Sequence, residues 1–443
     1  MNLKKRVIRV LAILAVFCIS LECIQIRSYT PVPTVSRHSS TFHCPMDEFS
    51  PCAPRQGNVR ALVFVVDFQD ITFSNSNSNP NATLLNTDEI QELIFGPENS
   101  SAFEYPYESG AAYYSRSSFG KLRFSGDVLY YKTNNTRDFY DTAWQSENSS
   151  DGYELLIKEI LTYYNSQLDY RDYDQNKDGA IDALYINVPL NNTLRDRDWW
   201  GNQSVWNETN PYSADETHVE KYVILDTQPL RNNKLYYNQV WIHETGHLLG
   251  LSDYYSVDNK PYETHEGFLG LGGFDMMDEM TGDHNIFSKI MCGWIPDSHI
   301  QKISPSTIGE GVTCILPTTE NHGDTILIPT VNYDGTYCSS YYLIENIGRR
   351  KNNLTAVSEG GIRIWRINAQ LTPDWWDSSK KMFAYDSNVT KTTTKLIEFV
   401  GGLYKNGTVI TPNSCPAAEA LPVQIKILST IATGYKIRIA PLN

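Results

Sequence analysis

The chain has 443 residues, of which 41% are hydrophobic and 20% are charged, an ordinary composition for a globular protein of two or three domains. Its 51 Asp and Glu residues outnumber its 37 Lys and Arg residues, so the formal net charge is -14 at pH 7. This charge argues against electrostatic capture of nucleic acid or of an anionic membrane surface. The composition also excludes a disordered, collagen-like or coiled-coil chain.

The N-terminus has the pattern of a secretory signal peptide. Lys4, Lys5 and Arg6 precede an apolar run from Leu11 to Leu21, which is too short to span a bilayer. We therefore expect residues 1–23 to be removed and the mature protein to be secreted, without stable membrane insertion. Residues 24–57 are rich in Pro, Ser and Thr and are expected to form a leader or short pro-segment.

Cysteine and asparagine patterns fit the same secretory route. Six of the eight cysteines lie beyond the signal peptide, and this even number predicts disulfide bonds, with Cys44 and Cys52 expected to pair with each other. Asn-X-Ser/Thr sequons predict a glycoprotein, in which each modified Asn would mark the surface. The ten sequons are at Asn81, Asn99, Asn134, Asn148, Asn191, Asn202, Asn207, Asn353, Asn388 and Asn406.

Residues 58–300 are predicted to alternate strands and helices, whereas the rest of the chain is β-rich. Val59–Phe68 is a nearly continuous apolar run, which predicts a strand buried on both faces. From about residue 301, short β runs follow one another to the C-terminus and predict a β-rich region over residues 301–443. Between these parts we expect a helix with Tyr113 and Tyr114 followed by a strand, an amphipathic helix over Tyr153–Leu168, strands at 183–188 and 221–227, and a helix around His243.

An acidic loop at residues 172–182 has the oxygen spacing that suits Ca²⁺. The twelfth position counted from Asp174 is Tyr185 rather than Glu, so the loop is not a full EF-hand. A structural calcium site is the prediction, and a solvated acidic turn is the alternative. The candidate ligands are Asp174, Asn176, Asp178 and Asp182.

The segment VWIHETGHLLGLSDYY carries the strongest chemical signal. On a helix, His243 and His247 stand one turn apart, so both imidazoles project from one face at a separation that suits tetrahedral Zn²⁺. Glu244 lies beside them as a candidate general base. Gly250 permits a sharp reversal that returns Asp253 to the metal as third ligand, completing HExxHxxGxxD. Four downstream residues are rival third ligands without that fixed spacing: Asp258, Glu263, His265 and Glu266.

A glycine-rich turn follows at residues 267–283 and contains three methionines. A Met beneath the metal would supply an apolar floor for the ligating imidazoles. Met277 is the preferred residue, and Met276 and Met280 are its neighbours.

With these motifs in place, the sequence resembles the immune inhibitor A-like secreted zinc metallopeptidases of the metzincin group. The resemblance covers roughly residues 58–370 and includes VVDFQD, SGAAYYSRSSFGKLRFSGDV, DQNKDGAIDAL, HETGHLLGLSDYY, GGFDMMD, YYLIEN and GGIRIWRI. It implies an α+β fold in which a catalytic domain over residues 58–300, a twisted sheet plus the zinc-site helix, precedes the β-rich region. It also implies His243, His247 and Asp253 as zinc ligands, Glu244 as base and Met277 as the Met-turn residue.

One departure from the metzincin pattern concerns transition-state stabilisation. Many metzincins place a Tyr two residues after the Met-turn Met, whereas this chain has Glu279 there. The candidates that remain for this role are Tyr255, Tyr254 and His284.

The sequence thus predicts a secreted zinc endopeptidase that acts on protein or peptide substrates. The alternative, from another functional class, is a catalytically silent binding or adhesion protein that keeps the scaffold, but the intact ligand set and base argue against it. A further possibility is that the β-rich region is a carbohydrate- or protein-binding module that directs the enzyme. Sequence alone indicates neither the cleavage preference nor the oligomeric state.

Overall fold

The computed structural model describes residues 53–73, 87–143, 152–189, 199–207, 210–227, 234–255, 271–373, 378–379, 381–384, 395–414 and 419–442. The predicted signal peptide, the Cys44–Cys52 pair and the rival ligands between residues 256 and 270 lie outside these residues. Within them, no helix is long and apolar enough to cross a membrane. Helices and strands are mixed, so the α+β class expected from the sequence is confirmed.

The first sheet is mainly parallel and has the strand order β2-β1-β3-β7-β4. Neighbouring strands are parallel except for the edge strand β4, which runs antiparallel to β7. The strands are β1 (Gly57–Asp67), β2 (Leu122–Lys132), β3 (Leu184–Val188), β4 (Asn202–Val205) and β7 (Lys221–Asp226). Helices accompany them at α2 (Thr87–Phe95), α3 (Gly110–Ser117), α4 (Arg137–Ala143), α5 (Gly152–Tyr164) and α7 (Lys234–Leu248).

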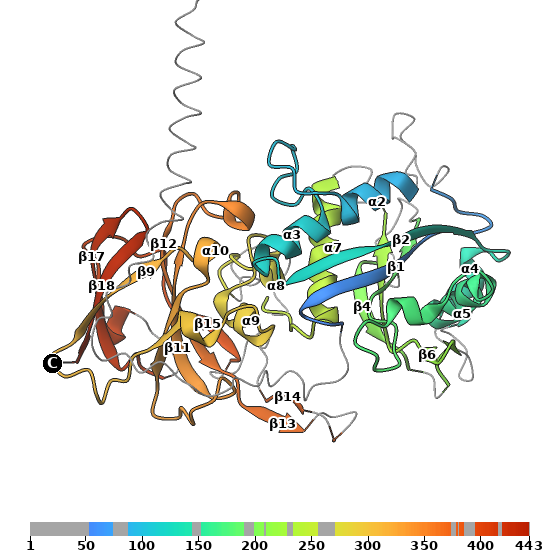
Figure 1. Cartoon of the computed structure of the whole chain (residues 1–443). Coiled ribbons are helices and arrows are strands. Elements are labelled where there is room, and N and C mark those ends of the chain that lie inside the picture. The colour runs from blue at the N-terminus through green and yellow to red at the C-terminus, as the bar shows by residue number, and fades with distance from the viewer. Residues whose placement is uncertain are drawn as a thin grey trace, which may run out of the picture. The chain divides into compact units, whose positions relative to one another are not determined.

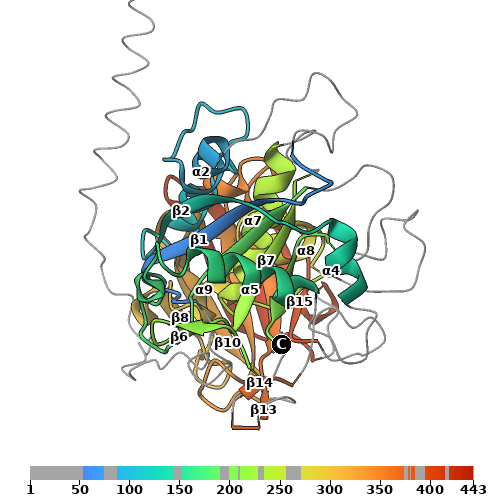
Figure 2. The same ribbon diagram turned by 90° about the vertical axis from the view of Figure 1, so that its right-hand side faces the viewer.

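Strand β1 is buried on both faces, as its sequence predicts. Val63 and Val65 belong to a core shared with α2, α3 and α7, whereas Leu62 and Phe64 pack with α5 on the other side. This alternation follows from the period of two in a β-strand. Figure 1 shows α2 and α3 above β2 and α7 crossing the strands, and the turned view of Figure 2 brings α4 and α5 toward the viewer. The sheet therefore holds α7, the helix with His243 and His247, on one face.

The β runs predicted after residue 300 form two further sheets. One has the order β15-β12-β11-β10-β8 and the other β16-β17-β18-β9. The strands of the first are β8 (Ile300–Lys302), β10 (Thr325–Pro329), β11 (Ser340–Ile347), β12 (Gly361–Asn368) and β15 (Ile397–Phe399). Those of the second are β9 (Val312–Pro317), β16 (Val409–Ile410), β17 (Val423–Ile431) and β18 (Gly434–Pro441).

Smaller elements connect these sheets. The strand pairs are β5 (Ser213–Ala214) with β6 (Thr217–His218) and β13 (Leu371–Pro373) with β14 (Lys381–Phe383). Short helices are α8 (Met276–Glu279), α9 (Ile286–Met291) and α10 (Thr319–His322), and 3-10 turns are η2 (Tyr170–Tyr173), η4 (Asp297–His299), η5 (Lys351–Asn353) and η6 (Pro412–Ser414).

One hydrophobic core crosses the boundary expected at residue 300. Val63 of β1 and Trp241 of α7 belong to the same buried cluster as Leu343 of β11 and Trp365 of β12. Side chains on both sides of this position are therefore packed together.

The structure bears on the expected glycosylation sites and on the expected disulfide bonds. Asn99, Asn134, Asn207 and Asn406 are exposed, but Asn353 is 2% exposed. Its amide nitrogen donates to Glu320 Oε1 at 2.9 Å, so the sequon at Asn353 does not mark the surface and a glycan there is incompatible with the fold. Among the described cysteines, Cys292, Cys314 and Cys338, the structure records no disulfide.

Candidate metal centre

Helix α7 and the turn after it bring together His243, His247 and Asp253. The ligand atoms of these three side chains all lie within 4.8 Å of one another, and they form the one such cluster among the described residues. The Nε2 atoms of His243 and His247 lie 3.0 and 3.2 Å from the same oxygen, Oδ1 of Asp253. The group can therefore hold a metal ion.

The turn has the geometry that its glycine predicts. Gly250 has a φ of +88°, a left-handed conformation that side chains other than hydrogen disfavour. The Gly250 N–H donates to His247 O, and the Leu251 N–H donates to Gly246 O. These bonds reverse the chain directly after the helix and return Asp253 to the two imidazoles.

Main-chain carbonyls fix the orientation of both imidazoles. His243 Nδ1 lies 2.9 Å from Met276 O, and His247 Nδ1 lies 2.8 Å from Leu251 O. Because a carbonyl oxygen only accepts, each Nδ1 carries the proton and donates it. In the neutral imidazoles the lone pair is therefore on Nε2, directed toward Asp253, as in histidines that bind metals.

The arrangement leaves an oxygen that only a positive charge would satisfy. Asp253 Oδ1 is buried without a hydrogen-bond partner among the described residues, although two Nε2 atoms are close to it. Lone pairs facing one another repel unless a proton or a metal ion lies between them. In a tetrahedral site with metal–ligand distances of about 2.0–2.1 Å, ligand atoms would be about 3.4 Å apart, close to the observed values. The three residues thus fit a small tetrahedral metal ion.

The pKa values of the site show the same attraction for positive charge. Burial alone would lower the pKa of His247, but Asp253 and Glu244 outweigh it and raise this pKa to about 9. Burial would raise the pKa of Asp253, yet the two imidazoles hold it well below its usual range. A metal ion would take the place of the extra proton.

The residues of the site differ in their exposure to solvent. His243 and Glu244 are 6% and 7% exposed, whereas the side chains of His247 and Asp253 retain 18% and 22% exposure. Glu244 directly follows the first histidine in α7. The exposed part of the site therefore lies at His247 and Asp253.

Met277 packs against α7. A Cβ built on Gly246 would overlap Met277 Sδ and lie 3.1 Å from Met277 Cε, so the thioether packs against the helix between the two histidines. Met277 O accepts a hydrogen bond from the Tyr254 N–H at 2.7 Å. The adjacent Met276 supplies the carbonyl for His243, and Glu279, two residues beyond Met277, is exposed.

The three candidates for transition-state stabilisation occupy different surroundings. The Tyr255 hydroxyl donates to Asp253 Oδ2 at 2.9 Å, whereas the Tyr254 hydroxyl is paired with Ser288 Oγ. His284 is enclosed by aromatic rings, and burial lowers its pKa to about 3. Of the three, Tyr255 has its hydroxyl at the metal-binding residues.

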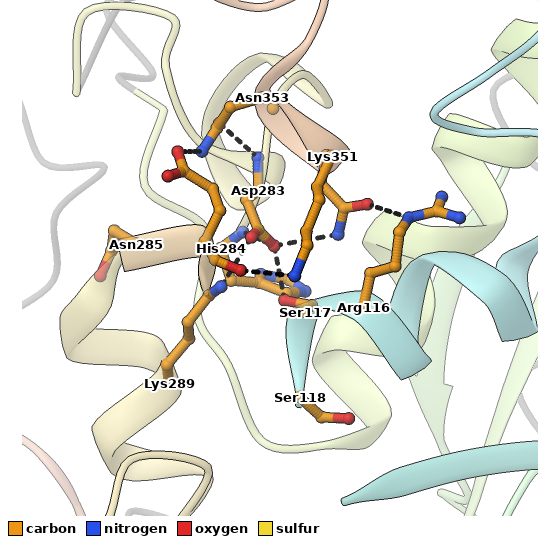
Figure 3. Close-up of polar contacts among 12 residues, drawn as sticks. Arg116, Ser117, Ser118, Asp283, His284, Asn285, Lys289, Lys351 and Asn353 are labelled. Carbon is orange, nitrogen blue, oxygen red and sulfur yellow. Dashed lines mark hydrogen bonds and ion pairs between the residues drawn. The ribbon is translucent and has the colours of Figure 1, made fainter. Parts of the chain in front are cut away.

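A buried polar network that the sequence did not reveal supports the segment after Met277. Asp283 accepts hydrogen bonds from Ser117 Oγ at 2.6 Å and from Asn352 Nδ2 at 3.1 Å, and it forms an ion pair with Lys289 at 2.6 Å (Figure 3). The Asp283 N–H donates to Asn353 Oδ1 at 3.0 Å. This network joins α3, α9 and η5, which are far apart in the sequence.

Hydrogen bonds from main-chain N–H groups hold the side chains of the acidic loop. Asp174 accepts from the N–H groups of Asp178 and Gly179, and Asp182 accepts from the Gln175 N–H at 2.7 Å. Asn176 Nδ2 donates to Asp178 Oδ2 at 2.9 Å. Burial, reinforced by Asp178 and Asp174, raises the pKa of Asp182 to about 7. The structure therefore brings the four predicted calcium ligands into one loop, but their carboxylates form no cluster as close as that of the metal centre.

Comparisons with protein-family models and with curated protein sequences find no match. Among solved structures, wild-type OgpA from Akkermansia muciniphila is similar with a TM-score of 0.28 and 10% identity, over 77% of this chain and 96% of that chain. A second crystal form gives a TM-score of 0.26 and 11% identity, over 79% and 95%. Catalytically inactive OgpA in complex with an O-glycopeptide substrate, glycodrosocin, gives 0.27 and 9%, over 77% and 95%. These values are too low to assign a fold or a function.

Proposed function

We propose that this chain is a secreted zinc-dependent endopeptidase of the metzincin group, similar to the immune inhibitor A-like enzymes. The observation that carries the proposal is the close approach of His243 Nε2 and His247 Nε2 to Asp253 Oδ1, which has no hydrogen-bond partner among the described residues. Two imidazoles and one carboxylate suit zinc, and three protein ligands leave a fourth position for water, as in catalytic rather than structural zinc sites. The packing of Met277 under α7 also supports this assignment.

When bound, zinc would lower the pKa of a coordinated water toward about 7 and polarise the scissile carbonyl. The chain's own residues supply the proton transfers and the geometry. The Glu244 carboxylate accepts a proton from the attacking water and delivers it to the leaving amine nitrogen. Met276 O and Leu251 O hold the imidazoles, and Tyr255 holds Asp253. No covalent intermediate between chain and substrate is required.

Substitution of Glu244 tests the mechanism directly. Glu244→Gln should keep zinc and the fold but lose about 10²- to 10⁴-fold in activity, because the carboxamide cannot accept the proton. The measurement is hydrolysis of a denatured protein substrate, alongside zinc content. Glu279→Gln, at an exposed position two residues after Met277, is the matched control and should retain full activity.

The same assay separates the proposal from a catalytically silent binding protein. An enzyme loses activity on treatment with a chelator and regains it when zinc is added back, whereas a silent protein hydrolyses nothing in either state. Undiminished turnover by Glu244→Gln would exclude the proposed base while leaving the metal site in place.

A further inference from the structure

Residues 53–56, which we call the N-terminal strap, run past the carboxyl end of α7. The Ala53 N–H donates to Leu248 O at 2.9 Å, and Arg55 Nε donates to Leu249 O at 3.0 Å. Ala53 is 3% exposed and belongs to the core that contains α7. The strap thus contacts the helix although nearly 200 residues separate the two segments.

The two carbonyls that the strap binds lie in the metal-binding turn. Leu248 directly follows the ligand His247, and Leu249 directly precedes Gly250. The last carbonyls of a helix lack partners within the helix, and a cation at this end interacts favourably with the helix dipole. The strap therefore fixes the chain at the point where it leaves the second imidazole and turns toward Asp253.

The strap is itself anchored at its other side. Trp294 Nε1 donates to Arg55 O at 2.7 Å, and Gln56 Nε2 donates to Gly293 O at 3.1 Å. Gly293 and Trp294 follow α9, which packs in the same core as Met277. The strap thereby bridges the metal-binding turn and the segment that carries the Met turn.

We propose that Ala53 and Arg55 are positioning residues of the metal centre, which hold the turn from His247 to Asp253 in its metal-binding geometry. The inference rests on the proposed function and extends it to maturation: residues 53–57, expected from the sequence to belong to the leader, are part of the working unit. Any cleavage that removes the leader must leave the chain intact from Ala53 onward.

Substitutions in the full-length chain, with zinc as the probe, test this role. Arg55→Met deletes the donor and keeps the apolar stem, and Ala53→Pro deletes the N–H while Ala53→Gly keeps it. Each deletion should weaken zinc binding about tenfold, the lower end of the effect of residues that orient metal ligands. The readouts are the zinc dissociation constant from chelator competition and the visible spectrum of the cobalt-substituted protein, which reports ligand geometry.

The controls separate positioning from a general loss of stability. Arg438→Met removes an arginine bond to a main-chain carbonyl, Glu310 O, outside the metal centre and should leave zinc affinity and the cobalt spectrum unchanged. Arg55→Lys, which retains a cationic donor, should recover part of the affinity. If Ala53→Pro does not fold, the zinc affinity and cobalt spectrum of Arg55→Met test the proposal. If the wild-type chain binds zinc and Arg55→Met has equal affinity and an identical spectrum, the role of the strap is overturned but the proposed function is not. If the wild-type chain does not bind zinc, the proposed function is overturned as well.

Discussion

The metal-binding turn and the acidic loop are both predicted cation sites, but their oxygens are satisfied in opposite ways. At Asp253, one oxygen is buried without a hydrogen-bond partner among the described residues, and it faces two imidazoles whose Nδ1 atoms donate to main-chain carbonyls. In the acidic loop, Asp174 and Asp182 accept hydrogen bonds from main-chain N–H groups of the loop itself. The first site therefore suits a positive charge, whereas in the second the loop's own main-chain N–H groups already satisfy the carboxylates.

This difference leads us to expect unequal responses of the two regions to added cations. Buried polar atoms without partners are costly, so a metal ion at Asp253 would remove a penalty that the fold otherwise carries. The loop carboxylates already have partners, and calcium would mainly offset the burial, and secondarily the repulsion from Asp178 and Asp174, that raise the pKa of Asp182. We expect a large response to metal at the turn and a small one at the loop.

Removal of the third ligand should have the largest effect on metal binding. Substitution of residues that orient metal ligands typically lowers metal affinity about 10- to 100-fold. Asp253→Ala removes a ligand itself and should lower zinc affinity by more than this. Chelator competition measures this affinity. Asp182→Ala and His265→Ala serve as controls and should barely change it. A strong effect of His265→Ala, with little effect of Asp253→Ala, would move the third ligand to the rival position.

A methyl group on Gly246 should disturb the packing of Met277 against α7. Gly246→Ala should reduce the free energy of unfolding by about 1–3 kcal/mol, because the new Cβ would overlap Met277. Denaturant unfolding measures the change, with Gly402→Ala as the matched control, because no atom of the described residues lies within 4 Å of a Cβ there. Adding Met277→Ala should recover part of the loss, and full additivity of the two losses would contradict the proposed packing.

The acidic loop should show the smallest effect, visible through pH. The pKa of Asp182 is raised to about 7 in the folded chain from its ordinary 3.8, so the stability that protonation contributes is present below about pH 4 and is lost as pH rises through 7. Without calcium, the wild-type melting temperature should therefore fall relative to that of Asp182→Asn over this range, by about 1 °C for each kcal/mol lost in a chain of this size. Calcium at pH 7 should restore it in the wild type only, and a calcium response that persists in Asp182→Asn would place the site elsewhere.

The sequence predicts local geometry well because local rules decide it. A separation of four residues places His243 and His247 on one helical face, and Gly250 has the left-handed conformation expected from its role in the motif. The apolar run of β1 and the short β runs beyond residue 300 also form strands as predicted. Each of these features depends on residues close together in the chain.

Contacts between distant segments explain what the sequence did not reveal. The Arg55 bond to Leu249 O joins residues 194 positions apart, and the Asp283 network depends on Asn352, 69 positions away. The same limit applies to Asn353, whose sequon resembles the exposed ones although its amide is buried against Glu320. Neither the hydrophobic periodicity of the sequence nor its motifs predict such contacts.

X-ray absorption at the zinc edge of the purified chain tests the central claim most directly. We expect one zinc per chain with two imidazole nitrogens at about 2.0–2.1 Å and carboxylate or water oxygens at about 2.0–2.2 Å. Loss of one oxygen contribution in Asp253→Ala would agree with its assignment as third ligand. Thiolate sulfur at about 2.3 Å, three imidazoles, or no bound zinc would contradict the proposed metal centre.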